Sequence, residues 1–147
     1  MPTGPAARIL DSVVHPTPPM LTGGPGSLTV LIGGLPAWRG LPLAKVAALQ
    51  ANKAASTARV NAAKGTPAGP GVEAAEMAAM SALIAGMAAV GADVHACVLH
   101  GAGVVTTGSA TVMIDNMPAC RMGDSILEAL GPPNVIVKGQ ANVIIGG

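Results

Sequence analysis

One block of nine residues occurs three times in this chain, and its spacing restricts the folds open to the sequence. The copies begin at Gly26, Gly108 and Gly139, which lie 82 and 31 residues apart, and these offsets hold along the whole block. Each copy alternates around β-branched residues and ends in Gly-Gly or Asp-Asn, which suit tight β-turns. Because such regular repeats indicate like structural units, we expect three β-hairpins.

A second motif, Pro-Ala-x-Arg, also occurs three times and belongs to the same repeat. Its copies begin at Pro5, Pro36 and Pro118. Three aspartates that differ by the same 82 and 31 residues mark the starts of the units, namely Asp11, Asp93 and Asp124. Three copies of one hairpin pack most simply about a pseudo-threefold axis, on which equivalent residues converge. The equivalent residues of chemical interest in this register are His15, Cys97 and Glu128.

The composition predicts a small hydrophobic core that needs an additional stabilising element. The chain has 147 residues with one Trp, no Phe and no Tyr, so the largest buried side chains are almost absent. A structural metal is one common means of stabilising a small core. With only two cysteines in a chain that shows no signal peptide, a thiol close to histidines is better interpreted as a metal ligand than as half of a disulfide.

The candidate metal ligands are concentrated in one short segment. His95, Cys97 and His100 lie within six residues and would supply three of the four ligands of a tetrahedral Zn²⁺ site. His15 is the candidate for the fourth, because it is the only other histidine. Glu128, at the third equivalent position, is its rival, and a loop role without metal is the alternative for His15. Cys120 is interpreted as a small buried hydrophobic residue.

An insertion interrupts the repeat between the first and second units. Arg8 and Asp11 are three residues apart, as are Arg121 and Asp124, whereas Arg39 and Asp93 are 54 apart. The extra 51 residues are 41–91, and 18 of them are alanine. This composition predicts a helix over 43–64 and a second from after 71 to about 90.

The second predicted helix carries a narrow apolar seam, which we expect to pack against the first helix or the hairpins. Its members are Met77, Met80, Ile84 and Met87. The charge-free run 77–92 has 16 residues, fewer than the roughly 20 that a bilayer requires, so a membrane span is not expected.

The charge pattern narrows the classes of partner. A formal net charge of +1 without Lys/Arg runs argues against a nucleic-acid partner. The N-terminus shows no secretory signal, so we expect the protein to be made in the cytoplasm. If it leaves the cell, we expect it to be carried out by another assembly. No Ser-His-acid arrangement or phosphate loop is visible, and four ligands would leave a metal no open position, so we expect no enzymatic activity.

Together, the Pro-Ala-x-Arg motifs, the Gly-Ser-x-Thr-Val hairpins and the His/Cys cluster resemble the PAAR-repeat proteins that tip contractile injection systems. The resemblance covers 1–40 and 92–147. It implies a mainly β fold, a small cone of three β-hairpins with pseudo-threefold symmetry. We therefore expect a single domain, with 41–91 as a helical-hairpin insertion. It also implies zinc bound by three His and one Cys, which fall on His15, His95, Cys97 and His100.

The same resemblance implies the partners and the place of action. The cone would cap a trimeric VgrG-like spike, one tip per trimer, within a type VI secretion system or an extracellular phage-tail-like particle. It would meet a target membrane only transiently during puncture, with effector cargo as a further partner. Two alternatives stay open: a free-standing zinc-stapled binding module, and a zinc hydrolase using His15, His95 and His100 with Glu128 as the base.

Overall fold

The computed structural model describes residues 2–14, 20–22 and 24–147. In these residues the chain forms two long α-helices, one 3-10 helix and ten short strands. The helices are α1 (Leu43–Ala63), α2 (Gly69–Ala85) and η1 (Gly86–Val90). The strands are β1 (Gly4–Ala6), β2 (Leu31–Ile32), β3 (Leu35–Pro36), β4 (Val94–Cys97), β5 (Gly101–Val105), β6 (Met113–Ile114), β7 (Met117–Pro118), β8 (Ser125–Glu128), β9 (Asn134–Val135) and β10 (Gln140–Ile145).

The fold class is mixed α and β, with small antiparallel sheets and two helices, so the expectation of a mainly β protein with a helical insertion is met in part. The helices have 21 and 17 residues, while no strand is longer than six. The strands are short because much of the β region (the described residues outside 41–91) is joined by isolated bridges and turns instead of long ladders. The two predicted helices are present, but α2 begins at Gly69 instead of after residue 71, and its last expected turn, Gly86–Val90, is the 3-10 helix η1.

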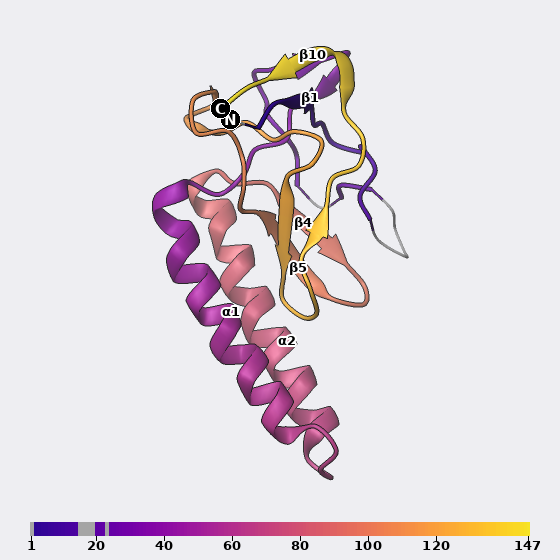
Figure 1. The fold of residues 1–147 in the computed structure, drawn as a ribbon, viewed down its shortest axis with the longest axis vertical. Helices are drawn as coiled ribbons and strands as arrows, with labels where there is room; N and C mark the ends of the chain where they lie inside the picture. Colours follow the sequence, from indigo (N-terminus) through magenta and orange to yellow (C-terminus); the bar gives the residue numbers. More distant parts are fainter. Residues whose placement is uncertain (1, 15–19, 23) are drawn as a thin grey trace.

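The repeated blocks form three equivalent strand pairs, but only two of them are hairpins. In β2–β3, Leu31 pairs with Pro36, and in β6–β7, Met113 pairs with Pro118. The third pair joins β10 to β1, so that Ile144 pairs with Pro5 from the other end of the chain. The third unit is therefore a hairpin split between the two ends of the chain, which lie close together in Figure 1.

A closed cycle of backbone hydrogen bonds joins the three Pro-Ala-x-Arg motifs. Ala7 N–H donates to Cys120 O (2.9 Å), Cys120 N–H donates to Trp38 O (3.2 Å), and Trp38 N–H donates to Ala7 O (3.0 Å). All three side chains are buried, so they fill the centre of the cycle. The three motifs thus make cyclically equivalent contacts, as pseudo-threefold symmetry requires. We call this cycle with its three strand pairs the basal ring.

A four-stranded antiparallel sheet, ordered β4-β5-β8-β9, extends from the basal ring. The turns that join β4 to β5 and β8 to β9 lie at the end of the β region away from β1 and β10 (Figure 1). The side chains of Val104 and Leu127, from β5 and β8, face the helices within one apolar cluster.

Helices α1 and α2 form an antiparallel pair, the helical arm, which runs along the sheet and projects beyond its turns (Figure 1). The predicted seam packs against the β region: Met80 and Ile84 are buried with Leu49 and Val104, and Met77 and Met87 pack against the same cluster. The interpretation of the methionines as packing residues is confirmed.

One segment of the described residues, Gly69–Val90, has the length and composition of a membrane-crossing helix, with a mean hydropathy of 1.4 over its most apolar window. It is longer than the charge-free run counted from the sequence, because the helix begins eight residues before Met77 and includes Glu73 and Glu76. One side of this segment is occupied by its packing against the sheet.

Candidate metal centre

Strand β4 places His95 and Cys97 on the same face of the sheet. Successive side chains of a strand point to opposite faces, and here His95 and Cys97 are buried while Ala96 between them is exposed. Thr22 N–H donates to His95 Nδ1 (3.2 Å), so Nε2 is the nitrogen that faces Glu128. Ligation of a metal ion through Nε2 would require Nδ1 to take up the ring proton and the Thr22 contact to change.

A glycine in the central strand lets residues from the two flanking strands meet. His95 pairs with Gly103 on β5, and Gly103 pairs with Glu128 on β8, so the three residues form one row across the sheet. A Cβ atom on Gly103 would lie 3.0 Å from Glu128 Cγ and 2.9 Å from Ile126 Cγ2. Without that atom, His95 Nε2 comes within 3.7 Å of Glu128 Oε1.

Cys97, His100 and Glu128 bring three candidate ligand atoms together, all within 4.8 Å of one another. His100 Nδ1 lies 2.8 Å from Glu128 Oε2, and His100 N–H donates to Cys97 Sγ (3.2 Å). Burial raises the pKa of the Cys97 thiol, an effect that the backbone N–H groups of His100 and Leu99 oppose by stabilising the thiolate. We call His95, Cys97, His100 and Glu128 the tip cluster.

The donors of the tip cluster suit a borderline metal ion. Thiolate sulfur, imidazole nitrogen and carboxylate oxygen are the three ligand types that Zn²⁺ accepts in proteins. Three of the predicted ligands, His95, Cys97 and His100, lie here, and so does Glu128. The fourth predicted ligand, His15, lies outside the described residues. Cys97 and Glu128 are equivalent in the repeat, so two of the three equivalent positions meet at this point.

Three of the four residues of the tip cluster lie within the part of the chain that is matched by a known protein family, and His95 directly precedes that part. A family profile described as the PAAR motif matches residues 96–147, which include Cys97, His100, Glu128 and the motif that begins at Pro118. The chain carries a PAAR motif. No curated protein and no solved structure matches it.

Cys120 occupies the variable position of the last PAAR motif and lies on the axis of the basal ring, fully buried beside Trp38 and Ala7. Burial raises the pKa of its thiol well above the ordinary value. A thiol held neutral in an apolar setting is a packing residue, as expected from the sequence.

Two residues that shape the tip cluster could not be identified from the sequence. Gly103 is one glycine among 20, and only its place in the row between His95 and Glu128 gives it a role. Lys53 on α1 donates from Nζ to the main-chain oxygens of Glu128 (2.8 Å) and Ala129 (3.0 Å). Burial lowers the pKa of Lys53, and the Glu128 carboxylate partly restores it.

Proposed function

We propose that this PAAR-repeat protein is the cone-shaped tip that caps the trimeric spike of a contractile injection system. The observation that carries the proposal is a set of apolar side chains repeated three times around the basal ring. The residues that precede the buried Ile32, Ile114 and Ile145 are all large, apolar and half exposed: Leu31 (63%), Met113 (50%) and Ile144 (59%).

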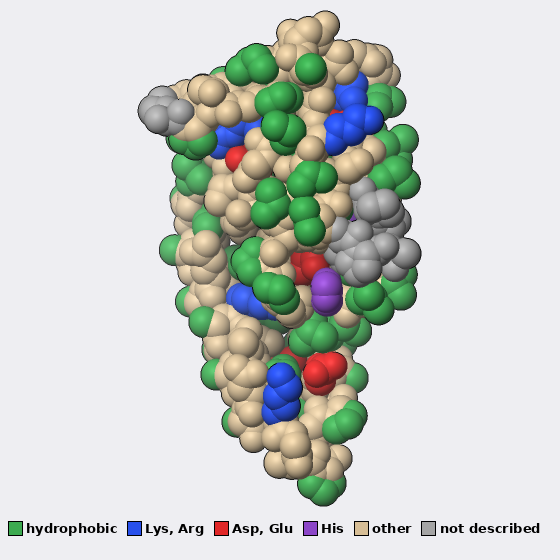
Figure 2. All heavy atoms as spheres, turned by 45° about the vertical axis from the view of Figure 1, so that its right-hand side comes forward, with side chains coloured by type: hydrophobic (Ala, Val, Ile, Leu, Met, Phe, Trp, Pro, Cys, Tyr) green, Lys and Arg blue, Asp and Glu red, His purple; other side chains and the backbone are tan. Residues whose placement is uncertain are grey.

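Such a surface suits a partner with threefold symmetry. Each of the three residues points away from the apolar cluster beneath the ring, because its neighbour in the strand is buried in that cluster. A trimer presents three identical patches about its axis, so one copy of this chain can meet all three subunits with like contacts. Lysines and arginines do not gather into a patch on the face seen in Figure 2, which agrees with a protein partner rather than nucleic acid.

The opposite end of the β region is the proposed metal site. We propose Zn²⁺ held by His15, His95, Cys97 and His100, with Glu128 as the rival ligand to His15. Support comes from the convergence of Cys97, His100 and Glu128 and from the repeat equivalence of His15 with two members of that cluster. A bound ion would cross-link β4 to neighbouring segments and stiffen this end of the β region, in a small protein that has little aromatic core.

The assembly proposal is tested with a purified trimeric spike. Mixing should give one copy of this chain per trimer, measured by light scattering. Substitution of Leu31, Met113 and Ile144 by Asp should abolish the complex, whereas Leu43→Asp, at a half-exposed position on α1, should leave it intact. Three tips per trimer, or equal losses from the ring and control variants, would refute the docking surface.

The metal proposal is tested by zinc content and thermal stability. The protein should hold one Zn²⁺ per chain, and Cys97→Ala should lose it while Cys120→Ala retains it. Comparing His15→Ala with Glu128→Gln identifies which of the two completes the site. Full zinc content in the Cys97 variant would reject the ligand set, and hydrolytic activity in that variant would favour the zinc hydrolase alternative. Zinc retention without any spike association would favour a free-standing binding module.

Cellular placement follows from this function. A PAAR protein belongs to a secretion or injection particle, so we propose that the chain is made in the cytoplasm, mounted on its spike and carried out with it. Contact with the target membrane would be confined to puncture, and effector cargo would be bound and not acted upon.

A further inference from the structure

The helical arm contacts the β5–β8 ladder at the pair formed by Ala102 and Ala129. The hydrogen bonding between these two residues is incomplete. In an antiparallel ladder, a hydrogen-bonded pair of residues exchanges two N–H···O=C bonds. Ala129 N–H donates to Ala102 O (2.8 Å), which is the first bond of such a pair. In place of the return bond, Ala102 N–H donates to Ser81 Oγ (3.1 Å) and Ala129 O accepts from Lys53 Nζ (3.0 Å). The donor of the missing bond is thus satisfied by α2, and its acceptor is satisfied by α1.

This pair lies directly beside the tip cluster. Ala102 precedes Gly103, the residue over which His95 and Glu128 meet, and Ala129 follows Glu128. Lys53 also binds the main-chain oxygen of Glu128 itself (2.8 Å). The arm therefore binds the backbone of residues that lie next to, or are among, the proposed ligands.

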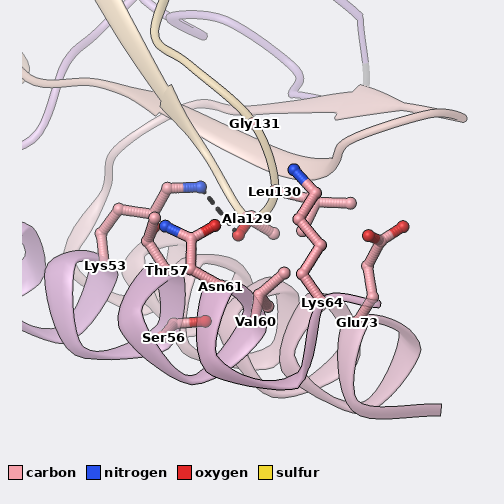
Figure 3. Close-up of a pocket in the computed structure, with 10 residues that line it drawn as sticks. All are labelled: Lys53, Ser56, Thr57, Val60, Asn61, Lys64, Glu73, Ala129, Leu130 and Gly131. Carbon is pink, nitrogen blue, oxygen red and sulfur yellow. Dashed lines mark hydrogen bonds between the residues drawn. The ribbon is translucent and has the colours of Figure 1, made fainter. Parts of the chain in front are cut away.

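The segment after β8 is held from two sides. On one side, Leu130 N–H donates to His100 O (2.9 Å), which ties the segment to the turn that carries His100. On the other side, Lys53 extends from α1 to Ala129 (Figure 3). A pocket of about 200 Å³ lies alongside, between the helical arm and residues 129–131, so packing there is not continuous and the lysine contact bridges this gap.

The second helix of the arm is equally close to β5. A Cβ atom at Gly101 would lie 2.3 Å from Ser81 Oγ and 3.2 Å from Met77 Cγ, so α2 rests on the backbone at the start of this strand. Gly101 follows His100 directly. A displacement of α2 would therefore move the backbone that carries this imidazole.

We propose that Lys53 and Ser81 are positioning residues of the metal centre, and that docking of the helical arm and binding of metal at the tip cluster are coupled. This inference rests on the proposed metal binding. By holding Ala129 O and Ala102 N–H apart, the two side chains set the separation of β5 and β8 that places Glu128 against His95 and His100. Coupling of this kind is reciprocal, so metal binding also stabilises the docked arm.

The test measures zinc affinity of the full chain by competition with a chromophoric chelator. Lys53→Met keeps the apolar stem and removes the ammonium group, and Ser81→Ala removes the hydroxyl. Each should weaken zinc binding about 10- to 100-fold, the usual range for residues that support ligands without touching the metal. Lys53→Arg, which can still donate to two carbonyls, should recover most of the affinity.

The sign of the Lys53→Met effect separates positioning from simple electrostatics. Removing a positive charge near a cation site would strengthen binding if charge alone mattered, so weaker binding requires a structural cause. Co²⁺ substitution supplies a second readout: the visible absorption bands of the bound ion should shift in Lys53→Met because the ligand geometry changes.

The matched control is Arg59→Met. Arg59 pairs with Glu76 within the arm, so its loss perturbs the arm without touching the β region. This variant should keep wild-type zinc affinity and the wild-type Co²⁺ spectrum. Hydrogen exchange should show that zinc slows exchange of the Ala102 amide and of α2 in the wild type, and does so less in Ser81→Ala.

Three results would overturn the coupling: unchanged zinc affinity in Lys53→Met, equal losses in Lys53→Met and Arg59→Met, or arm exchange rates that do not respond to zinc. A wild-type protein that fails to bind zinc would refute the proposed metal function and the coupling together. A wild type that binds zinc while Lys53→Met binds it equally well would refute the coupling alone.

Discussion

Arg39 Nη2 lies 2.9 Å from Asp93 Oδ1, although 54 positions separate the two residues in the chain. The same contact joins Arg8 to Asp11 (2.9 Å) and Arg121 to Asp124 (3.1 Å), which are three positions apart. In each case the backbone N–H of the arginine also donates to the aspartate carboxylate, at 2.7 to 2.8 Å. The Arg–Asp contact of the ring is thus the same whether two residues or the helical arm lies between the arginine and the aspartate.

Loss of the Asp93 carboxylate should destabilise the fold strongly. Asp93 is fully buried and accepts hydrogen bonds from Arg39 and from Gly26 N–H, so Asp93→Asn leaves the partly buried Arg39 guanidinium with Asp115 as its remaining charge partner. Breaking a fully buried pair costs about 3–5 kcal/mol, and the remaining Arg39–Asp115 contact should keep the loss near the lower end of that range. Denaturant unfolding measures the loss, and Glu76→Gln, at the exposed pair in the arm, should leave the midpoint unchanged. Similar effects of the two substitutions would argue against the ring as the stabilising element.

Trp38 should be the most costly apolar side chain to truncate. It is fully buried on the axis of the ring, and among the described residues its indole nitrogen has no hydrogen-bond partner. Trp38→Ala should therefore cost about 3–5 kcal/mol through the cavity it leaves. Trp38→Phe should cost much less, since no hydrogen bond is broken. Thermal unfolding followed by circular dichroism compares the variants, and equal losses would contradict the importance of filled volume at the axis.

Replacing Leu10 with glycine should stabilise the protein. Leu10 has φ of 71°, a conformation that is unfavourable for residues with a Cβ, and the equivalent position in the last repeat is Gly123, with φ of 97°. Relief of this strain should raise stability by up to about 1 kcal/mol, which is about 2–4 °C in Tm for a domain of this size.

Gly123→Ala is the reciprocal control for Leu10. A Cβ at Gly123 meets no atom within 4 Å, so its cost is backbone strain alone. The substitution should lower Tm. If Leu10→Gly lowered Tm as well, side-chain packing of the half-exposed leucine would outweigh the strain.

Asp115 should contribute to acid sensitivity. Hydrogen bonds from Ser27 and Thr29, together with the Arg39 charge, lower the pKa of this carboxyl in the folded state. Because the folded pKa is below the unfolded value, the contribution to stability is present above about pH 4 and is lost as the pH falls through the folded pKa. Tm of Asp115→Asn should be lower than wild type at pH 7, and the gap should narrow toward pH 3. A gap independent of pH would contradict this assignment.

The repeat made most of the β region predictable. Subtracting the 51 residues of 41–91 from the spacing of 82 leaves 31, the spacing of the second and third units, and the Arg39–Asp93 contact agrees with this register. The equivalence of Cys97 and Glu128 likewise predicted that both approach one site, as their ligand atoms do. Exact spacing is informative because equivalent residues of a closed ring must make equivalent contacts.

Other features depend on contacts that no local pattern encodes. A period of 3 to 4 residues marks Met80 and Ile84 as a packing seam but does not say which strand they meet. Lys53 has the sequence context of a solvent-exposed helical lysine, and its role appears only when α1 lies against the turn after β8. The split of the third hairpin escaped prediction because β10 has no partner next to it in the chain, and only ring closure brings β1 to it.

The pairing of β1 with β10 also affects biosynthesis. A ribosome makes the chain from its N-terminal side, so Gly4–Ala6 emerges before Gln140–Ile145 and stays unpaired while the residues between the two strands are made. The first two hairpins and the helices can form while the chain is still tethered, but the basal ring cannot close until the last strand has left the exit tunnel. Ile144 reaches its place beside Leu31 and Met113 at that moment. A nascent chain that has not yet released β10 would therefore lack a complete threefold face, which restricts the proposed capping to molecules in which β1 and β10 have paired.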